Sequence, residues 1–190
     1  MKRLLAFSGS SRLHSINQAL LQAAIRLAES KGATVDVIDL KALGLPLYDG
    51  DLEAASGLPQ GAKDLKAAMQ KADGFLITSP EYNSFPSPLL LNAIDWASRA
   101  EAKDEPPLVA FKGKTAGLLA TSPGPMGGQR SLVTLRDKLQ NIGVTVAPVV
   151  TAVGKGSEDL FQDPDFLSTS NGQRVEKTVS ALLSLDINHV

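Results

Sequence analysis

Apolar positions recur along this chain with two spacings, one typical of buried strands and the other typical of amphipathic helices. Short apolar runs bounded by polar or glycine-containing segments predict strands at residues 4–7, 34–40, 74–78, 114–121 and 144–150. Segments with apolar residues three and four positions apart predict helices at residues 18–29, 60–72, 88–100, 129–141 and 175–185. Strand and helix therefore alternate, which predicts an α/β fold with a parallel sheet covered by helices on both faces.

Turn and cap residues support several of these boundaries. Gly32 and Gly143 each follow a predicted helix, where a glycine commonly ends the last turn. Ser87 is suited to cap the helix that starts at Pro88, and proline fits the first turn of a helix. Residues 43–59 are rich in glycine, proline and acidic side chains, so we predict a long loop there, either solvated or acting as a lid or interface element.

The first predicted strand leads into a polar loop, residues 8–17, that opens the first helix. The start of a helix has unpaired backbone N–H groups and a partial positive charge, and both favour an anion such as phosphate. The loop also offers the small Gly9, the Arg12 guanidinium, and polar side chains at Ser10, Ser11, Ser15 and Asn17. It lacks the lysine of a Walker loop and the three spaced glycines of a dinucleotide fingerprint, so it favours a phosphomonoester. A helix cap at Ser15 followed by a solvated turn is the alternative interpretation of this stretch alone.

Two further loops follow the third and fourth predicted strands, and the carboxyl ends of parallel strands meet at one edge of a sheet. In the loop at residues 79–88, Tyr82 and Phe85 offer flat apolar surface and Asn83 offers an amide. In the loop at residues 122–128, three glycines allow the main chain to lie against a planar ring. The alternatives are a packed Tyr82, a capping or surface role for Glu81, and glycines that serve only a tight turn. Together the three loops predict a site for a planar ring that carries one phosphate, a description that fits FMN.

Composition narrows the classes of function. The 190 residues carry a net charge of -1 and are 43% hydrophobic, which suits one globular domain over residues 1–190. There is no basic run and no stretch of roughly 20 apolar residues, so we expect binding to neither nucleic acid nor membrane. The first residues make a poor signal peptide, so we expect a cytoplasmic protein.

The chain contains no cysteine, and His14 and His189 are its only histidines. Thiol nucleophiles, disulfides and iron–sulfur clusters are therefore excluded, and we expect no metal site. Redox chemistry in such a chain would require an organic cofactor. A hydrolase is disfavoured because there is no Gly-x-Ser-x-Gly elbow and the two histidines lie at opposite ends of the sequence.

Four sets of residues carry a resemblance to a known family. They are Gly9, Ser10, Ser11, Arg12, Ser15 and Asn17; then Pro80, Glu81, Tyr82 and Asn83; then residues 88–99, which include Asp95, Trp96, Ala97, Ser98 and Arg99; and finally Ser122, Pro123, Gly124, Gly127, Gly128 and Arg130. With these motifs, from residue 2 to about residue 150, the chain resembles the NADPH-dependent FMN reductases of flavodoxin-like fold. That group includes bacterial chromate, quinone and azo-dye reductases. The resemblance implies a flavodoxin-like three-layer sandwich, a five-stranded parallel sheet of order 2-1-3-4-5, and a homodimer or homotetramer.

The resemblance also implies roles for individual residues. Ser10, Arg12, Ser15 and Asn17 would hold the FMN phosphate, residues 80–83 would line the ring and ribityl side, and the loop at residues 122–128 would lie near the ring. The full set of expected cofactor-binding residues is Ser10, Arg12, Ser15, Ile16, Asn17, Pro80, Glu81, Tyr82, Asn83, Ser122, Pro123, Gly124 and Gly127. No side chain is expected to act as an acid, base or nucleophile, because FMN would carry the chemistry.

The implied activity is transfer of hydride from NADPH to bound FMN and then to a small acceptor, with ping-pong kinetics. The acceptor would be a quinone, flavin, chromate or azo compound, and NADH is the alternative donor. The main competing interpretation is a flavodoxin-type FMN electron carrier that serves partner proteins. Strongly acidic surfaces often steer such partners, so the net charge of -1 favours the reductase.

Overall fold

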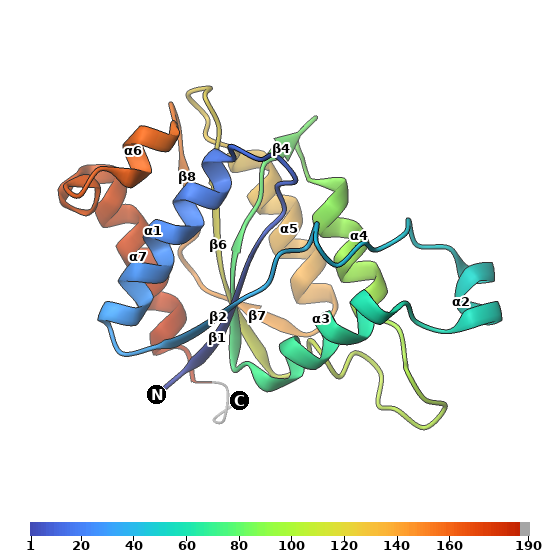
Figure 1. Cartoon of the computed structure of the whole chain (residues 1–190). Coiled ribbons are helices and arrows are strands. Elements are labelled where there is room, and N and C mark those ends of the chain that lie inside the picture. The colour runs from blue at the N-terminus through green and yellow to red at the C-terminus, as the bar shows by residue number, and fades with distance from the viewer. Residues whose placement is uncertain (187–190) are drawn as a thin grey trace.

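The computed structural model describes residues 1–186, and a parallel β-sheet forms its centre (Figure 1). The strands are β1 (Arg3–Ser8), β2 (Thr34–Val37), β3 (Gly74–Thr78), β6 (Lys114–Thr121), β7 (Val144–Val146) and β8 (Thr151–Val153). They lie in the order β2-β1-β3-β6-β7, with β8 also paired to β6, and all of these pairings are parallel. This arrangement confirms the predicted flavodoxin-like sheet of order 2-1-3-4-5.

Helices cover both faces of the sheet (Figure 1). One face is covered by α1 (Ile16–Ser30), α6 (Glu158–Gln162) and α7 (Ser170–Ser184), and the other by α3 (Gln60–Lys71), α4 (Pro88–Ala97) and α5 (Gln129–Asn141). Because side chains alternate along a strand, Leu4 and Ala6 enter the core beneath α1 and α7, whereas Leu5 and Phe7 enter the opposite core. None of the helices within residues 1–186 is long and apolar enough to cross a bilayer.

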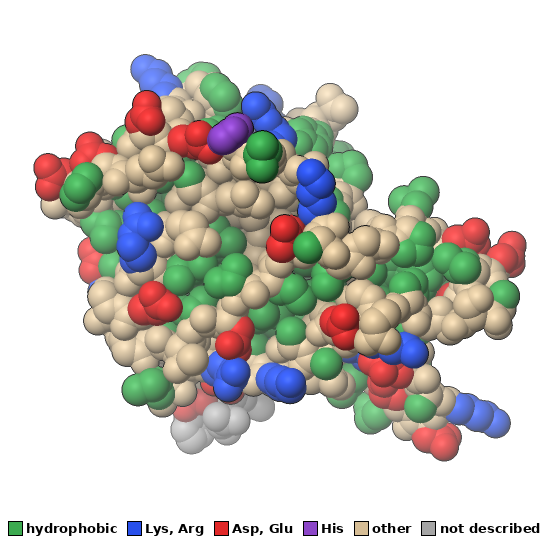
Figure 2. Space-filling view, in the orientation of Figure 1, with side chains coloured by type: hydrophobic (Ala, Val, Ile, Leu, Met, Phe, Trp, Pro, Cys, Tyr) green, Lys and Arg blue, Asp and Glu red, His purple; other side chains and the backbone are tan. Residues whose placement is uncertain are grey.

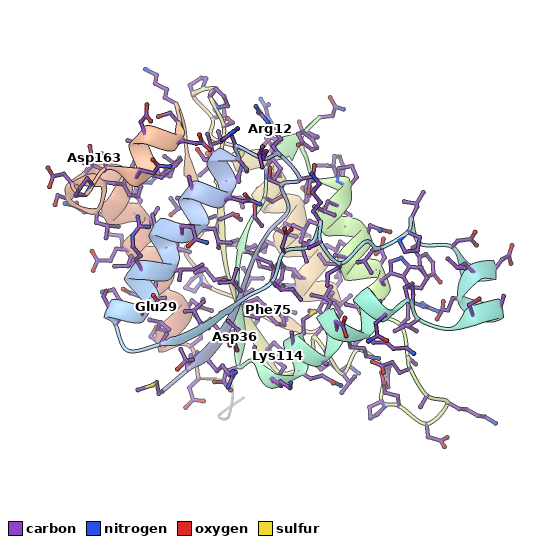
Figure 3. The ribbon with its side chains drawn as sticks, viewed as in Figure 1. Arg12, Glu29, Asp36, Phe75, Lys114 and Asp163 are labelled. Atoms are coloured by element: carbon purple, nitrogen blue, oxygen red, sulfur yellow. The ribbon has the colours of Figure 1, made fainter. Side chains whose placement is uncertain are left out.

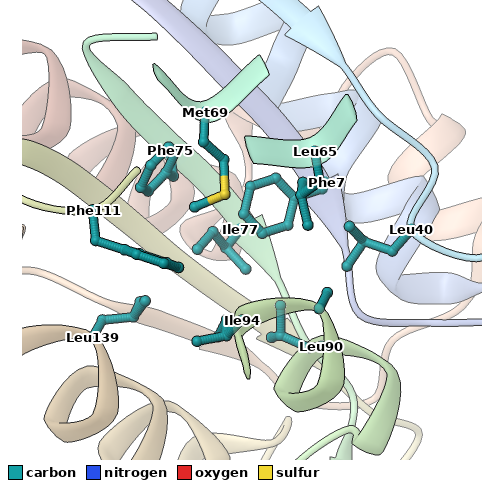
Figure 4. A pocket seen from close by; sticks show the side chains of 11 residues that line it. Phe7, Leu40, Leu65, Met69, Phe75, Ile77, Leu90, Ile94, Phe111 and Leu139 are labelled. Atoms are coloured by element: carbon teal, nitrogen blue, oxygen red, sulfur yellow. The ribbon is translucent and has the colours of Figure 1, made fainter. Parts of the chain in front are cut away.

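The core beneath α3, α4 and α5 contains a small cavity of about 10 Å³ (Figure 4). Its lining is apolar and includes the rings of Phe7, Phe75 and Phe111 and the thioether of Met69. A volume of this size is at the lower limit for one water molecule, and the lining offers a water no hydrogen-bond partner. The cavity is therefore a packing gap rather than a ligand site.

The fifth predicted strand, residues 144–150, is interrupted. β7 pairs with the start of β6 and β8 pairs with its end, and residues 148–150 between them leave the regular ladder after Ala147 N donates to Ala116 O at 2.8 Å. Pro148 lies in this interruption and has no N–H to donate to a ladder. The prediction of one continuous strand is therefore wrong.

Segments predicted as loops also contain short regular elements. Within residues 43–59, α2 (Gly50–Ser56) is capped by Asp49, whose carboxylate accepts a hydrogen bond from Asp51 N at 2.8 Å. The loop at residues 79–88 contains an antiparallel hairpin of β4 (Glu81–Tyr82) and β5 (Phe85–Pro86). After α6 and a short 3-10 helix η1 (Phe166–Ser168), α7 starts five residues before its predicted position at residue 175. Two other elements are shorter than predicted, since β2 ends at residue 37 and α4 at residue 97.

Candidate functional site

Three loops meet at the carboxyl edge of the sheet, which is uppermost in Figure 1. The first loop joins β1 to α1, the second joins β3 to α4, and the third joins β6 to α5. A pocket of about 130 Å³ lies among them and is lined by Ser10, Arg12, Ser15, Ile16, Asn17, Pro80, Glu81, Tyr82, Thr121, Ser122 and Pro123. Figure 3 shows Arg12 at this edge and Lys114, the first residue of β6, at the opposite edge. The topology thus gathers distant parts of the sequence around one pocket.

Most of the residues expected to bind a cofactor line this pocket. The exceptions are Asn83, at the tip of the hairpin, and Gly124 and Gly127 in the third loop, which lie outside the lining. Thr121, the last residue of β6, lines the pocket too, although its side chain is not among the expected cofactor-binding residues. Its position directly before Ser122, at a strand's carboxyl end, is the signal that could have identified it.

The first loop presents a helix terminus with free donors. Ser15 caps α1, because its Oγ accepts a hydrogen bond from Gln18 N at 3.2 Å. Within residues 1–186, the backbone N–H groups of Ile16 and Asn17 have no hydrogen-bond partner, and helix geometry directs them toward the N-terminal end of α1. Arg12 lies in the same loop with an exposed side chain. The capping role of Ser15 is thus compatible with an anion site, since two donors, the helix dipole and a guanidinium still suit a phosphate.

The side chain of Asn17 is engaged with the protein. Its Nδ2 donates to Thr121 O at 3.0 Å, its Oδ1 accepts from Thr121 N at 3.1 Å, and the residue is 2% exposed. These two bonds fix the first turn of α1 to the end of β6. Asn17 therefore offers a ligand its backbone N–H, while its carboxamide positions the first loop against the third.

The second loop is shaped by the β4–β5 hairpin. Asn83 and Ser84 form its tip with φ angles of 51° and 70°, the left-handed conformation found in two-residue hairpin turns. Tyr82 and Phe85 are paired across the strands and are 44% and 56% exposed, so neither is a packed core residue. Exposed rings beside a polar pocket are suited to contact with a planar ligand.

Ser87 fastens the second loop to the first. Its hydroxyl donates to Gly9 O at 2.5 Å and accepts from Leu90 N at 3.2 Å as the N-cap of α4. A Cβ on Gly9 would lie 2.6 Å from this Oγ and 2.9 Å from Leu90 Cβ. The absence of a side chain at Gly9 therefore permits the close approach of the first loop to α4.

The third loop turns on two glycines. Gly127 and Gly128 have φ angles of 61° and 88°, and a Cβ on Gly127 would lie 2.5 Å from the carbonyl carbon of Val153. These glycines thus serve a tight turn and a close approach of two backbone segments. The same loop lines the pocket through Ser122 and Pro123.

Glu81 directs its carboxylate toward the start of α5. Its Oε2 accepts a hydrogen bond from Ser131 N at 3.0 Å, and its Oε1 lies 3.9 Å from Arg130 Nη1. This geometry supports a capping role for Glu81, which also lines the pocket.

The pocket offers hydroxyls and one carboxylate, that of Glu81, which accepts a hydrogen bond from Ser131 N. Its lining contains serine and threonine hydroxyls but no histidine beside them. His14 is 79% exposed, and its Nδ1 lies 3.7 Å from Glu158 Oε1. His189 lies outside the described residues. A nucleophile activated by histidine is therefore disfavoured at this pocket, and chemistry carried by FMN stays a prediction.

Comparison with known proteins identifies the family. The family model described as NADPH-dependent FMN reductase matches residues 2–158. The NAD(P)H-dependent FMN reductase PA1204 of Pseudomonas aeruginosa is 39% identical over 137 residues, which are 72% of this chain and 69% of that protein. The NADPH:quinone oxidoreductase of Arabidopsis thaliana is 39% identical over 136 residues, which are 70% of this chain and 64% of that protein.

A solved structure agrees with the fold over nearly its whole length. The flavoenzyme NAD(P)H:(acceptor) oxidoreductase FerB from Paracoccus denitrificans is similar with a TM-score of 0.73 and 27% sequence identity, over 96% of this chain and 98% of that one. By contrast, the matches to the two curated relatives span 69% and 64% of their lengths. The chain belongs to the NADPH-dependent FMN reductase family of NAD(P)H-dependent oxidoreductases.

Proposed function

We propose that this chain binds FMN in the pocket at the carboxyl edge of the sheet and uses it to oxidise NADPH, or alternatively NADH, and to reduce a small acceptor. Bound FMN would supply the chemistry by taking hydride from the nicotinamide and passing the electrons on, so that donor and acceptor react in turn in a ping-pong sequence. The acceptors in this proposal are quinones, free flavin, chromate and azo compounds. The observation that carries it is the pair of free N–H groups of Ile16 and Asn17 beside Arg12, in a pocket whose other walls are the second and third loops.

Several groups at the pocket have a task in this proposal. The N–H groups of Ile16 and Asn17 and the guanidinium of Arg12 would bind the phosphate through charge-assisted hydrogen bonds. The second and third loops, which line the pocket through Tyr82 and Ser122, would contact the planar ring. The exposed rings of Tyr82 and Phe85 leave apolar surface near the pocket for the nicotinamide or the acceptor.

The competing interpretation is a flavodoxin-type electron carrier that exchanges electrons with a partner protein. Such exchange is often steered by a strongly acidic surface. On the face seen in Figure 2, acidic and basic side chains are interspersed, and the net charge of the chain is -1. These observations favour small-molecule partners.

We further propose that residues 1–190 form a single FMN-binding domain that acts in the cytoplasm as a homodimer or homotetramer. This part of the proposal draws on the resemblance to the family. Sedimentation of the purified protein would test the assembly, and a monomer at micromolar concentration would contradict it.

The experiment that tests the activity is anaerobic reduction followed by visible spectroscopy. The purified protein, supplied with FMN, should show a bound-flavin spectrum that bleaches within seconds of NADPH addition and returns when a quinone is added. A flavin spectrum that persists with both NADPH and NADH would favour the carrier. A protein that takes up no FMN would overturn the proposal.

A further inference from the structure

Helix α5 begins without a cap of its own. Its N-cap residue, Gly128, has a φ of 88° and no side chain, and the first turn contains no acidic residue. The N–H groups of such a turn lack intrahelical acceptors, and the positive end of the helix dipole is uncompensated.

Glu81 supplies the missing cap from another loop. Its Oε2 accepts from Ser131 N at 3.0 Å, and Ser131 is the third residue of α5, whose N–H is the one that a capping serine or aspartate commonly binds. The Glu81 side chain is 16% exposed, whereas that of Arg130, at 3.9 Å, is 63% exposed. The backbone hydrogen bond is therefore the main contact, because an exposed ion pair contributes little.

This hydrogen bond joins the second loop to the first turn of α5, which directly follows the third loop, and both loops line the pocket. Glu81 lies between Pro80 and Tyr82, which line one wall, and Ser131 follows the loop that carries Ser122. The hairpin strands β4 and β5 have two residues each. A hairpin this short does not hold its position alone, so its placement depends on tertiary contacts.

We propose that Glu81 is a positioning residue for these two walls. Its carboxylate acts on the Ser131 N–H rather than on a ligand, and it fixes the β4–β5 hairpin against the third loop. The part of this proposal that concerns FMN rests on the proposed function, whereas the contact with Ser131 is independent of it.

Amide hydrogen exchange of the full-length apoprotein and FMN titration together test this proposal. Glu81→Gln keeps the length of the side chain and an acceptor oxygen, whereas Glu81→Asp keeps the charge but is one methylene shorter. The control is Glu29→Ala, which removes an exposed acid of α1. Exchange of the Ser131 amide should be about tenfold faster in Glu81→Asp and near wild type in the other two variants. The FMN dissociation constant and the circular dichroism of bound FMN should differ from wild type in Glu81→Asp. In Glu81→Gln both should match wild type.

Three outcomes separate this proposal from the proposed function. Equal Ser131 exchange in wild type and Glu81→Asp would overturn the positioning role even if FMN binds. Faster Ser131 exchange in a protein that binds no FMN would support the contact and overturn the proposed function. Fast hydrogen exchange of the Ser131 amide in Glu81→Gln would also contradict the proposal. This result can be obtained even if Glu81→Asp does not fold.

Discussion

Hydrogen bonds from single side chains hold the loops of the pocket to one another. Asn17 joins the first loop to the third through the backbone of Thr121, and Ser87 joins the second loop to the first through Gly9 O. In our proposal, Glu81 joins the second loop to the third. Each contact is made to a backbone group, so it fixes the main chain itself. Loops that are already ordered require less reorganisation when a ligand binds.

Asn17 gives a prediction at the scale of one residue. Asn17→Ala would leave the N–H and C=O of Thr121 without their partner, so we expect the free energy of unfolding to fall by about 1–3 kcal/mol. Urea unfolding of the apoprotein measures this change, with Asn141→Ala at the exposed end of α5 as the control. A loss no larger than that of the control would contradict the positioning role of Asn17.

The sequence predicts which residues gather at the pocket better than it predicts what each one contacts. A polar loop between a strand and a helix indicates an anion site, because free N–H groups are a local property of any helix start. The partner of Asn17, in contrast, lies 104 positions away, and that of Glu81 lies 50 positions away. No local pattern encodes these distances, so the sequence places both residues at the pocket but does not reveal that their side chains bind backbone groups of other segments.

At the scale of elements, residues 43–59 are anchored to α4 although most of this segment is irregular. Trp96 Nε1 and Asn92 Nδ2 both donate to Pro46 O at 2.8 Å, and Tyr48 N donates to Asn92 Oδ1 at 2.8 Å. The rings of Tyr48 and Trp96 pack edge to face with centroids 5.1 Å apart. The segment is thus a docked arm, fixed to α4 at Pro46 and Tyr48, while most of its other side chains are exposed to solvent. A lid or interface role stays a prediction.

An ionic cluster completes the attachment of this arm. Glu53 accepts hydrogen bonds from Arg99 Nε at 2.9 Å and from Tyr48 OH at 2.8 Å. Burial raises the pKa of Glu53, but the hydrogen bonds from Arg99 and Tyr48 and the charge of Arg99 outweigh it and leave the pKa below its ordinary value. The hydrogen bond to Glu53, followed by burial, raises the pKa of Tyr48.

This cluster predicts how stability depends on pH. Since the pKa of Glu53 is lowered by folding, its ionised form stabilises the protein above the unfolded pKa of about 4.3, and this contribution is lost as the pH falls through the lower folded pKa. The melting temperature of Glu53→Gln should therefore lie below wild type by a constant amount from about pH 6 to 8, and the gap should shrink below about pH 4. Glu29→Gln, an exposed acid, serves as the control. A gap that is unchanged at acid pH would contradict this account.

The elements with the clearest patterns are predicted to the residue, namely β3, β6 and α5. The errors fall where tertiary context decides. The β4–β5 hairpin is too short to show a period of two, and residues 144–150 carry a strand-like pattern that is interrupted around Pro148.

At the scale of the whole molecule, two cores share one sheet, and strands β1, β3, β6 and β8 contribute side chains to both. Alternation of strands and helices in the sequence predicts this layered α/β fold from local periods alone. The order of the strands is not a local property, and it was expected only through the resemblance to flavodoxin-like reductases.

The shared sheet predicts that the chain unfolds as one unit. Trp96, the only tryptophan, is fully buried in a third cluster with Leu58 and Ala62. Its fluorescence therefore reports on the docked arm, whereas far-ultraviolet circular dichroism reports on the whole fold. In urea the two signals should give coincident transitions, as expected for a single domain. A fluorescence transition that precedes the dichroism transition would show that the arm and α4 separate from the rest.

The most direct test of the central claim compares the binding of FMN and riboflavin to the apoprotein by fluorescence titration. If the start of α1 and Arg12 bind the phosphate, FMN should bind at least about a hundredfold more tightly than riboflavin, since each charge-assisted hydrogen bond contributes about 1.5–3 kcal/mol. Arg12→Ala should weaken FMN binding by about tenfold and leave riboflavin nearly unchanged, whereas Arg174→Ala on α7 should change neither. Equal affinities for the two flavins, or no binding of either, would contradict the claim that this pocket holds FMN by its phosphate.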